Sequence, residues 1–233
     1  MKKNLQILLS TLLGVMMIFV SACSIDKMPK SLEKFLANDF KNVTINVSGK
    51  MENTFEEGAR EAYSEEIAVL ILTNSGKYYE ELTSGENYWL GSYKNFYAKI
   101  KEESYEYWEE EGVWKRRKDG ADYEKVFENM KESNGLAMLY ALSATDFEAE
   151  DDWYYLKQSA YKKIEEWVTA GTMEYFKIKI AEEKVVVEFS TSSTYPDING
   201  EMVTHSTYLS FTFSDFGKTK VVLPKEFTDL DAR

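Results

Sequence analysis

The sequence predicts an α+β domain in which strands of an antiparallel sheet stand on both sides of a helical middle. Apolar and polar residues alternate over 43–51, which is the pattern of a half-buried strand. Over 123–130 the apolar residues instead recur at i, i+3, i+4 and i+7, as on one face of a helix. Alternation returns over 203–213. Since no internal repeat and no long linker separates these segments, we expect one domain.

The first half of the chain predicts a helix followed by a meander of strands. Ser31 suits an N-cap, and apolar residues follow it at helical spacing as far as Phe40. After the strand at 43–51, further short strand-like segments are bounded by Gly, Asn and Ser: 67–73, 77–82, 87–90, 105–108 and 113–116. Short strands separated by turn residues are typical of an antiparallel meander.

The second half predicts helices and then a return to strands. We expect short helices over 123–130 and 136–142, a strand over 152–157 and a further helix over 161–168. The expected closing strands are 176–180, 185–189, 203–213 and 221–224. Asp197–Glu201 is similar to the opening of a calcium loop but lacks the acids that such a loop requires, so it predicts a hairpin turn.

The N-terminus carries the features of an export signal. Lys2 and Lys3 precede an apolar run that ends in small residues before Cys23. The sequence Val20-Ser21-Ala22-Cys23 resembles the lipobox of bacterial lipoproteins. This resemblance implies a signal peptide at 1–22, a lipidated tether at 23–31 and a folded domain at 32–233. It also implies a palmitate-type lipid on Cys23 at the extracytoplasmic face of the cell membrane. An uncleaved anchor is the alternative.

Composition limits the classes of partner. The 233-residue chain has a formal net charge of −12. Since Lys2 and Lys3 are the only charged residues before Cys23, the chain without its signal would stand at −14. Such a surface argues against nucleic acid, which requires clustered Lys and Arg. Cys23 is the single cysteine, so no disulfide within the chain is expected.

Two local motifs resemble a known superfamily. One is Thr212–Lys218, which runs into Val221–Pro224, and the other is the pair Tyr105–Trp108 and Gly112–Lys115. Together with the lipobox and the order of elements, they resemble the lipoprotein-carrier-like (LolA/LppX-type) half-barrel superfamily. The resemblance implies a curved antiparallel half-barrel sheet wrapped partly around helices, with an apolar cavity. It supplies no catalytic motif and no cofactor.

Candidate catalytic and metal-binding residues are few. His205 is the only histidine, and it stands among the inward positions of its strand, so a hydrogen-bonded structural role is expected. A zinc site or a conventional triad needs partners of defined type and spacing, which the sequence does not offer. No phosphate-binding loop is present. The chain is therefore predicted not to be an enzyme.

Aromatic residues crowd the predicted meander. On adjacent strands they would form a ladder whose ordinary role is core packing, although an exposed part could stack sugars or line an apolar groove. The candidate ligand-binding residues combine this series with the helix at 123–130: Tyr79, Trp89, Tyr107, Trp114, Phe127 and Met130.

These observations predict a membrane-anchored, non-catalytic lipoprotein that binds a lipid or other apolar ligand. The alternative is a cell-surface module that binds a protein or a glycan through exposed aromatics. A hydrolase is disfavoured because no pair of acids stands out from the many acidic residues.

Overall fold

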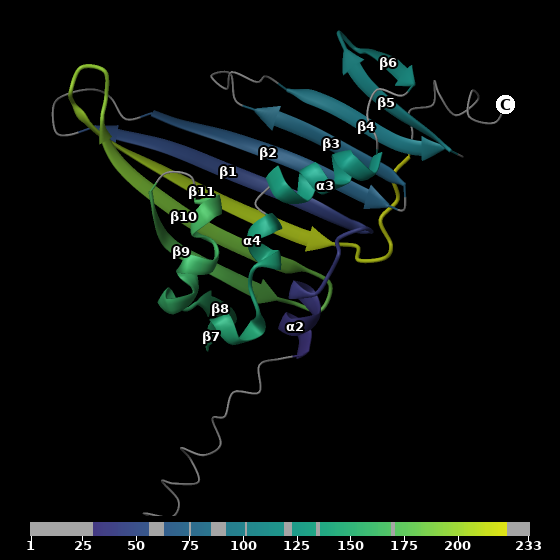
Figure 1. The fold of residues 1–233 in the computed structure, drawn as a ribbon. Coiled ribbons are helices and arrows are strands. Elements are labelled where there is room, and N and C mark those ends of the chain that lie inside the picture. The colour runs from purple at the N-terminus through teal and green to yellow at the C-terminus, as the bar shows by residue number, and fades with distance from the viewer. Residues whose placement is uncertain are drawn as a thin grey trace, which may run out of the picture.

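The computed structural model describes residues 30–55, 63–74, 76–84, 92–100, 102–118, 123–133, 136–168 and 171–222, and strands account for most of these residues. The strands form one 11-stranded sheet (Figure 1). Their bounds are β1 Val43–Phe55, β2 Tyr63–Asn74, β3 Lys77–Ser84, β4 Tyr93–Ile100, β5 Glu103–Glu110, β6 Val113–Lys118, β7 Phe147–Glu150, β8 Trp153–Leu156, β9 Thr172–Ile180, β10 Val185–Pro196 and β11 Met202–Ser214.

The order of strands follows from two meanders that meet in the middle. The sheet order is β6-β5-β4-β3-β2-β1-β11-β10-β9-β8-β7, and the neighbouring strands are antiparallel. The chain therefore moves outward from β1 to one edge, crosses the sheet, and returns from the other edge to β11. The first and last strands pair along their length, from Thr44 with Ser214 to Phe55 with Val203.

The helices all lie against one face of the sheet, which we call the helix-bearing face (Figure 1). They are α2 Lys30–Leu36, α3 Tyr123–Ser133 and α4 Leu136–Tyr140, with the 3-10 segments η1 Ala144–Asp146, η2 Gln158–Lys163 and η3 Glu165–Trp167. The main core lies between them and the sheet. Phe35 of α2 packs edge-on against Phe213 of β11, with ring centroids 5.1 Å apart, and Leu136 and Leu139 of α4 are buried in the same cluster.

A smaller core lies on the opposite face. Tyr79, Phe96 and Tyr107 are cross-strand neighbours on β3, β4 and β5, and their rings are buried there. The chain after β11 turns onto this face, where Val221 packs into the same cluster and is 5% exposed. The C-terminal segment thus seals an apolar patch that the helices do not reach.

The fold class predicted from the sequence, an α+β half-barrel wrapped partly around helices, is wrong. The structure is mainly β: a single large antiparallel sheet carries few, short helices. The reason is that two of the predicted helices are shorter than expected, so helices form a smaller part of the fold than the sequence predicts. The expected helix at 161–168 consists of the short 3-10 segments η2 and η3, and the expected helix at 136–142 closes after five residues in α4.

Other local predictions have mixed outcomes. The strands expected at 43–51, 152–157 and 203–213 are confirmed by β1, β8 and β11. The turn at Asp197–Glu201 is confirmed, since the Glu201 carbonyl accepts from the Asp197 N–H at 2.8 Å between β10 and β11. Val221 and Val222 do not form the strand predicted for 221–224. The segment 87–90 lies outside the described residues.

Candidate functional site

Along the helix-bearing face, the side chains of the three central strands, β1, β11 and β10, change from apolar to mainly polar. Because alternate residues of paired strands share a face, the register sorts their side chains into layers, one residue each from β1, β11 and β10. The three layers nearest the helices are apolar: Ile45, Phe213 and Val185; Val47, Phe211 and Val187; and Gly49, Leu209 and Phe189. The next two are largely polar: Met51, Thr207 and Thr191; then Asn53, His205 and Ser193.

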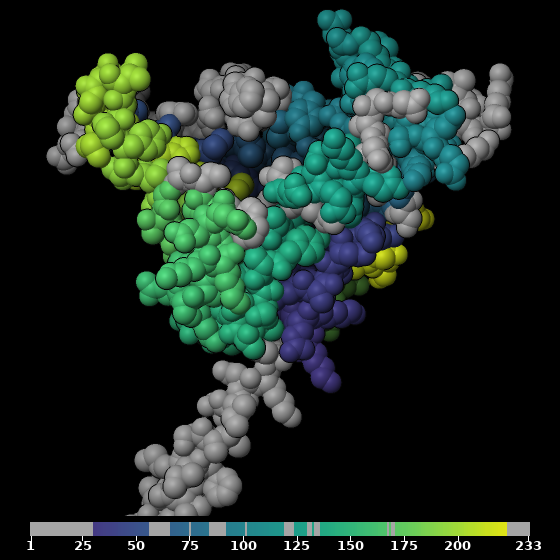
Figure 2. All heavy atoms as spheres, viewed as in Figure 1, coloured from purple at the N-terminus to yellow at the C-terminus, as the bar shows by residue number. Residues whose placement is uncertain are grey.

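Burial follows the same division. Ile45, Phe211 and Phe213 are buried beneath the helices, whereas Asn53 and His205 are only half-buried, as are their neighbours in the polar layers. Figure 2 shows the molecule hollowed at this end, above α3 and beside the β10–β11 hairpin, with β1, β2 and β11 visible in the depth. We call this region the hollow. Its floor passes from aromatic to hydrogen-bonding side chains.

Gly49 marks the last apolar layer. A Cβ atom at this position would lie 2.8 Å from both Ile67 Cγ1 and Leu209 Cδ2. The absence of a side chain therefore lets Ile67 and Leu209 approach each other over β1 and close the apolar part of the face. Beyond Gly49, the side chains of Met51 and Thr207 are half-buried. The glycine separates the packed core from the hollow.

His205 is held in the polar layers by two side chains. Its Nδ1 lies 2.7 Å from the amide oxygen of Asn53, its register partner on β1, and its Nε2 lies 3.2 Å from Thr207 Oγ1. Since an amide oxygen can only accept, Nδ1 is the donor to Asn53, and in the neutral ring Nε2 can then accept from the Thr207 hydroxyl. Both ring nitrogens of His205 are therefore within hydrogen-bonding distance of a side chain of the polar layers.

The predicted ligand-binding residues divide between the two faces. Tyr79, Tyr107 and Trp114 belong to the cluster on the opposite face, where Phe96 contacts both Tyr79, at 4.4 Å between ring centroids, and Trp114, at 5.5 Å. Phe127 of α3 is buried in the main core. Cys23, Trp89 and the Met130 side chain lie outside the described part of the chain. These residues do not form one site in the described structure.

The inward position predicted for His205 is confirmed, but its hydrogen-bonding neighbours were not predicted from the sequence. Asn53 stands 152 residues away in sequence, and only the pairing of the first strand with the last brings the two together. A signal was present in the alternation itself, because Thr207 and His205 interrupt the otherwise apolar inward positions of 203–213 between Leu209 and Val203.

Within the described ranges, no group of three or more His, Cys, Asp or Glu side chains is placed to hold a metal ion. Among the helices that the structure describes, none combines the length and the hydropathy needed to cross a bilayer.

Comparisons with known proteins give distant structural likenesses. No protein-family model and no curated protein matches the chain. It is similar to an AttH candidate from Nitrosomonas europaea, with 10% identity and a TM-score of 0.23, over 82% of this chain and 56% of that chain. It is also similar to a LolA superfamily protein from the same organism, with 9% identity and a TM-score of 0.22, over 85% and 96% of the two chains. The chain thus spans little more than half the length of the AttH candidate. Likenesses of this size assign neither family nor function.

Proposed function

We propose that the protein is a non-catalytic binding protein whose hollow holds an amphiphilic ligand of the lipid class. The observation that carries the proposal is the change of polarity across consecutive layers of the helix-bearing face. An acyl chain would lie against Leu209 and Met51, which are half-buried at the boundary between the apolar and polar layers. The polar end of the same molecule would meet Asn53 and His205.

The energetics of burial favour a ligand that has one apolar end and one polar end. Each methylene group that leaves water contributes about 0.8 kcal/mol, so contact with the half-buried Leu209 and Met51 favours an alkyl chain. A polar group buried there without a partner would cost free energy, whereas the next layers offer hydrogen-bonding side chains. A purely apolar ligand would leave Asn53, His205 and Ser193 facing it without new partners. The layered floor therefore suits an amphiphile better than a hydrocarbon.

The contacts of His205 support binding rather than acyl-transfer chemistry. A histidine between a hydroxyl and an amide has the order of groups found in a triad, but acyl transfer also needs N–H donors for the developing oxyanion. Residues Val203–Phe213 of β11 have register partners on both β1 and β10. Their backbone N–H groups are thus engaged in the sheet, so the strand that carries His205 and Thr207 offers none to an oxyanion.

Export and lipidation through Cys23 belong to the same proposal. The lipobox-like sequence ends at Cys23, seven residues before α2 begins at Lys30. One acyl chain gives only marginal membrane binding, so two or more chains are expected on the mature N-terminus. The protein would then act at the extracytoplasmic face of the cell membrane.

Filling the hollow tests the binding proposal. Thr207→Trp places an indole in the first polar layer, while Ser206→Trp places the same side chain on the opposite face of the same strand. Residues 24–233 of each variant, purified gently from a bacterial host, would be examined by native mass spectrometry. We expect a bound lipid mass in the wild type and in Ser206→Trp, lost on denaturation, and a clean apo mass in Thr207→Trp. An apo mass in all three after incubation with lipid extracts would refute the proposal.

The anchor is tested on the full chain. With Cys23→Ser, we expect incorporation of radiolabelled palmitate to cease and the protein to leave the membrane fraction, because the acceptor thiol is absent. A second variant, Ser24→Ala, alters the adjacent residue and should retain the label. Labelling of Cys23→Ser at the wild-type level would contradict lipidation at this position.

A further inference from the structure

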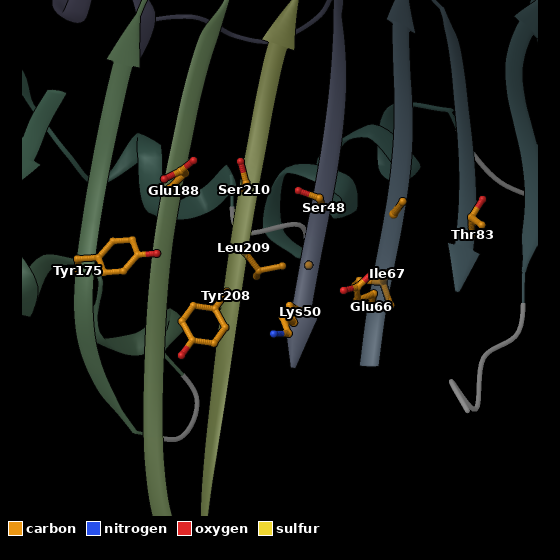
Figure 3. Close-up of a pocket in the computed structure, with 12 residues that line it drawn as sticks. Ser48, Lys50, Glu66, Ile67, Thr83, Tyr175, Glu188, Tyr208, Leu209 and Ser210 are labelled. Carbon is orange, nitrogen blue, oxygen red and sulfur yellow. The ribbon is translucent and has the colours of Figure 1, made fainter. Parts of the chain in front are cut away.

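The face opposite the helices carries a groove of about 710 Å³ across the middle of the sheet (Figure 3). It exists because one row of short side chains crosses four neighbouring strands: Ser210 of β11, Ser48 of β1, Ala68 of β2 and Thr83 of β3, each paired with the next. We call this row and its walls the trough. At about 4.8 Å between strands, the row is about 14 Å long.

Two tyrosines form one wall of the trough. Tyr175 of β9 and Tyr208 of β11 are both register partners of Ser190 on β10. Figure 3 shows their rings on either side of β10, next to the row of short side chains. Ser190 is 2% exposed between them, while Tyr208 is 38% exposed. An aromatic surface therefore remains open to solvent beside the trough.

Two of the charged groups that line the trough, Lys50 and Glu188, form ion pairs within the protein. Glu188 Oε2 lies 3.0 Å from Lys177 Nζ, and Lys50 Nζ lies 2.5 Å from Glu52 Oε1. Glu66 is the register partner of Lys50 on β2. Glu66 adds one negative charge to these two pairs, so the trough offers mainly hydroxyls and aromatic rings with a small negative excess. Since the whole chain carries −12, a polyanion would also be repelled.

The backbone beneath the trough excludes the usual binding of an extended peptide. Strand addition needs an exposed sheet edge with unpaired N–H and C=O groups. The trough instead crosses central strands, and both β1 and β11 are paired on their two sides. An apolar ligand is disfavoured as well, because it would cover the hydroxyls of Ser48, Ser210 and Thr83 without bonding to them.

We propose that the trough binds an extended, neutral oligosaccharide of β-1,4-linked pyranoses. A pyranose ring presents C–H groups on its faces and hydroxyls at its edges. The faces would pack on Tyr208 and Tyr175, and the edges would exchange hydrogen bonds with Ser48 and Ser210. A β-1,4 linkage keeps the chain straight, as the straight row of short side chains requires. The trough and the hollow lie on opposite faces of the sheet, and Leu209 borders both.

The test uses isothermal titration of residues 24–233 with chitohexaose and cellohexaose, and with maltohexaose as a coiled α-1,4-linked control. We expect binding of at least one β-1,4-linked hexasaccharide and none of maltohexaose. Tyr208→Ala should weaken binding about tenfold. Ser48→Trp, which fills the row, should abolish it. Tyr195→Ala removes a tyrosine that is 46% exposed outside the trough and should bind like the wild type.

Oligosaccharide binding by the trough and lipid binding by the hollow can be tested independently. Thr207→Trp should retain oligosaccharide binding, and Ser48→Trp should retain any lipid mass. Near-ultraviolet circular dichroism and the Tm of each variant show that it is folded. The proposal is overturned if neither β-1,4-linked hexasaccharide binds at millimolar concentration or if Ser48→Trp binds as well as the wild type. Equal binding of maltohexaose, or binding of an unstructured peptide instead, would also overturn it.

Discussion

Tyr78 and Tyr97 are neighbouring residues whose hydroxyl groups the protein keeps neutral. They are register partners on β3 and β4, with ring centroids 5.8 Å apart on the helix-bearing face. Burial, together with the negative charge of Glu106, raises the pKa of Tyr97 to about 12. Burial and the adjacent Glu80 carboxylate raise the pKa of Tyr78 well above its usual value. The Tyr78 hydroxyl donates to Glu80, which also accepts from Tyr93.

These pKa values predict a loss of stability in alkali. Between pH 10 and pH 12 the unfolded chain releases the Tyr97 proton while the folded chain retains it, so the free energy of unfolding falls as the pH rises. In Tyr97→Phe this fall should be less steep, because one such group is gone. Urea unfolding at pH 8, 10 and 11 measures it, and the pH 8 values serve as the baseline for each protein. Equal slopes in the two proteins would contradict the prediction.

The segment after β11 shows how an extended stretch can stabilise a sheet without joining it. The Gly217 N–H donates to the Asn42 carbonyl at 2.9 Å, and the Thr219 N–H donates to Asn42 Oδ1 at 2.9 Å. The Asn74 amide donates to the Thr219 carbonyl at 2.6 Å. These bonds direct Val221 onto the aromatic cluster of the opposite face. The segment acts as a cover for that cluster.

Adjacent valines in this segment allow a matched comparison. Val221 is 5% exposed and Val222 is 71% exposed. Val221→Ala should lower the free energy of unfolding by about 2 kcal/mol, because it removes buried methyl groups and leaves a cavity. Val222→Ala should change it by less than about 0.5 kcal/mol. Urea unfolding followed by tryptophan fluorescence distinguishes the two, and equal losses would show that Val221 does not anchor the segment.

The molecule as a whole is an open sheet, so two edge strands remain, and both are charged. β6 at one edge is basic, with Lys115, Arg116, Arg117 and Lys118, whereas β7 at the other edge carries Glu148 and Glu150. Exposed ion pairs such as Arg117 with Glu106, at 2.5 Å, add little stability. The charges of β6 instead oppose the addition of a strand from another molecule.

Removing those charges should therefore promote association. In Arg116→Val with Lys118→Val, we expect oligomers at concentrations at which the wild type is monodisperse. The control is Lys162→Val with Lys218→Val, which removes the same charge from exposed positions away from the edge. Size-exclusion chromatography with light scattering gives the molar mass of each. Association of the control to the same extent would assign the effect to net charge rather than to the edge.

Local patterns predicted the strands better than the class of the fold or the sites. Alternation located β1 and β11 because each has one face against a core. The spacing over 161–168 matched a helix equally well, but the chain there is short 3-10 turns. Alternation also cannot tell which face is which, so Tyr79 and Phe127 were grouped although they lie on opposite faces. The trough depends on the register between strands distant in sequence, which no local pattern contains.

The length of β1 sets the distance between the end of the sheet next to α2 and the hollow. This strand runs without interruption from Val43, in the same core cluster as α2, to Phe55 beyond the hollow. The ten residue-to-residue steps from Val43 to Asn53 span about 34 Å of extended chain. That exceeds the roughly 30 Å thickness of a bilayer's hydrocarbon core. For a chain anchored at Cys23 and standing upright, a lipid could not pass directly between the bilayer and the hollow. Loading would require the body to lean over on its tether or a second protein to deliver the cargo from above.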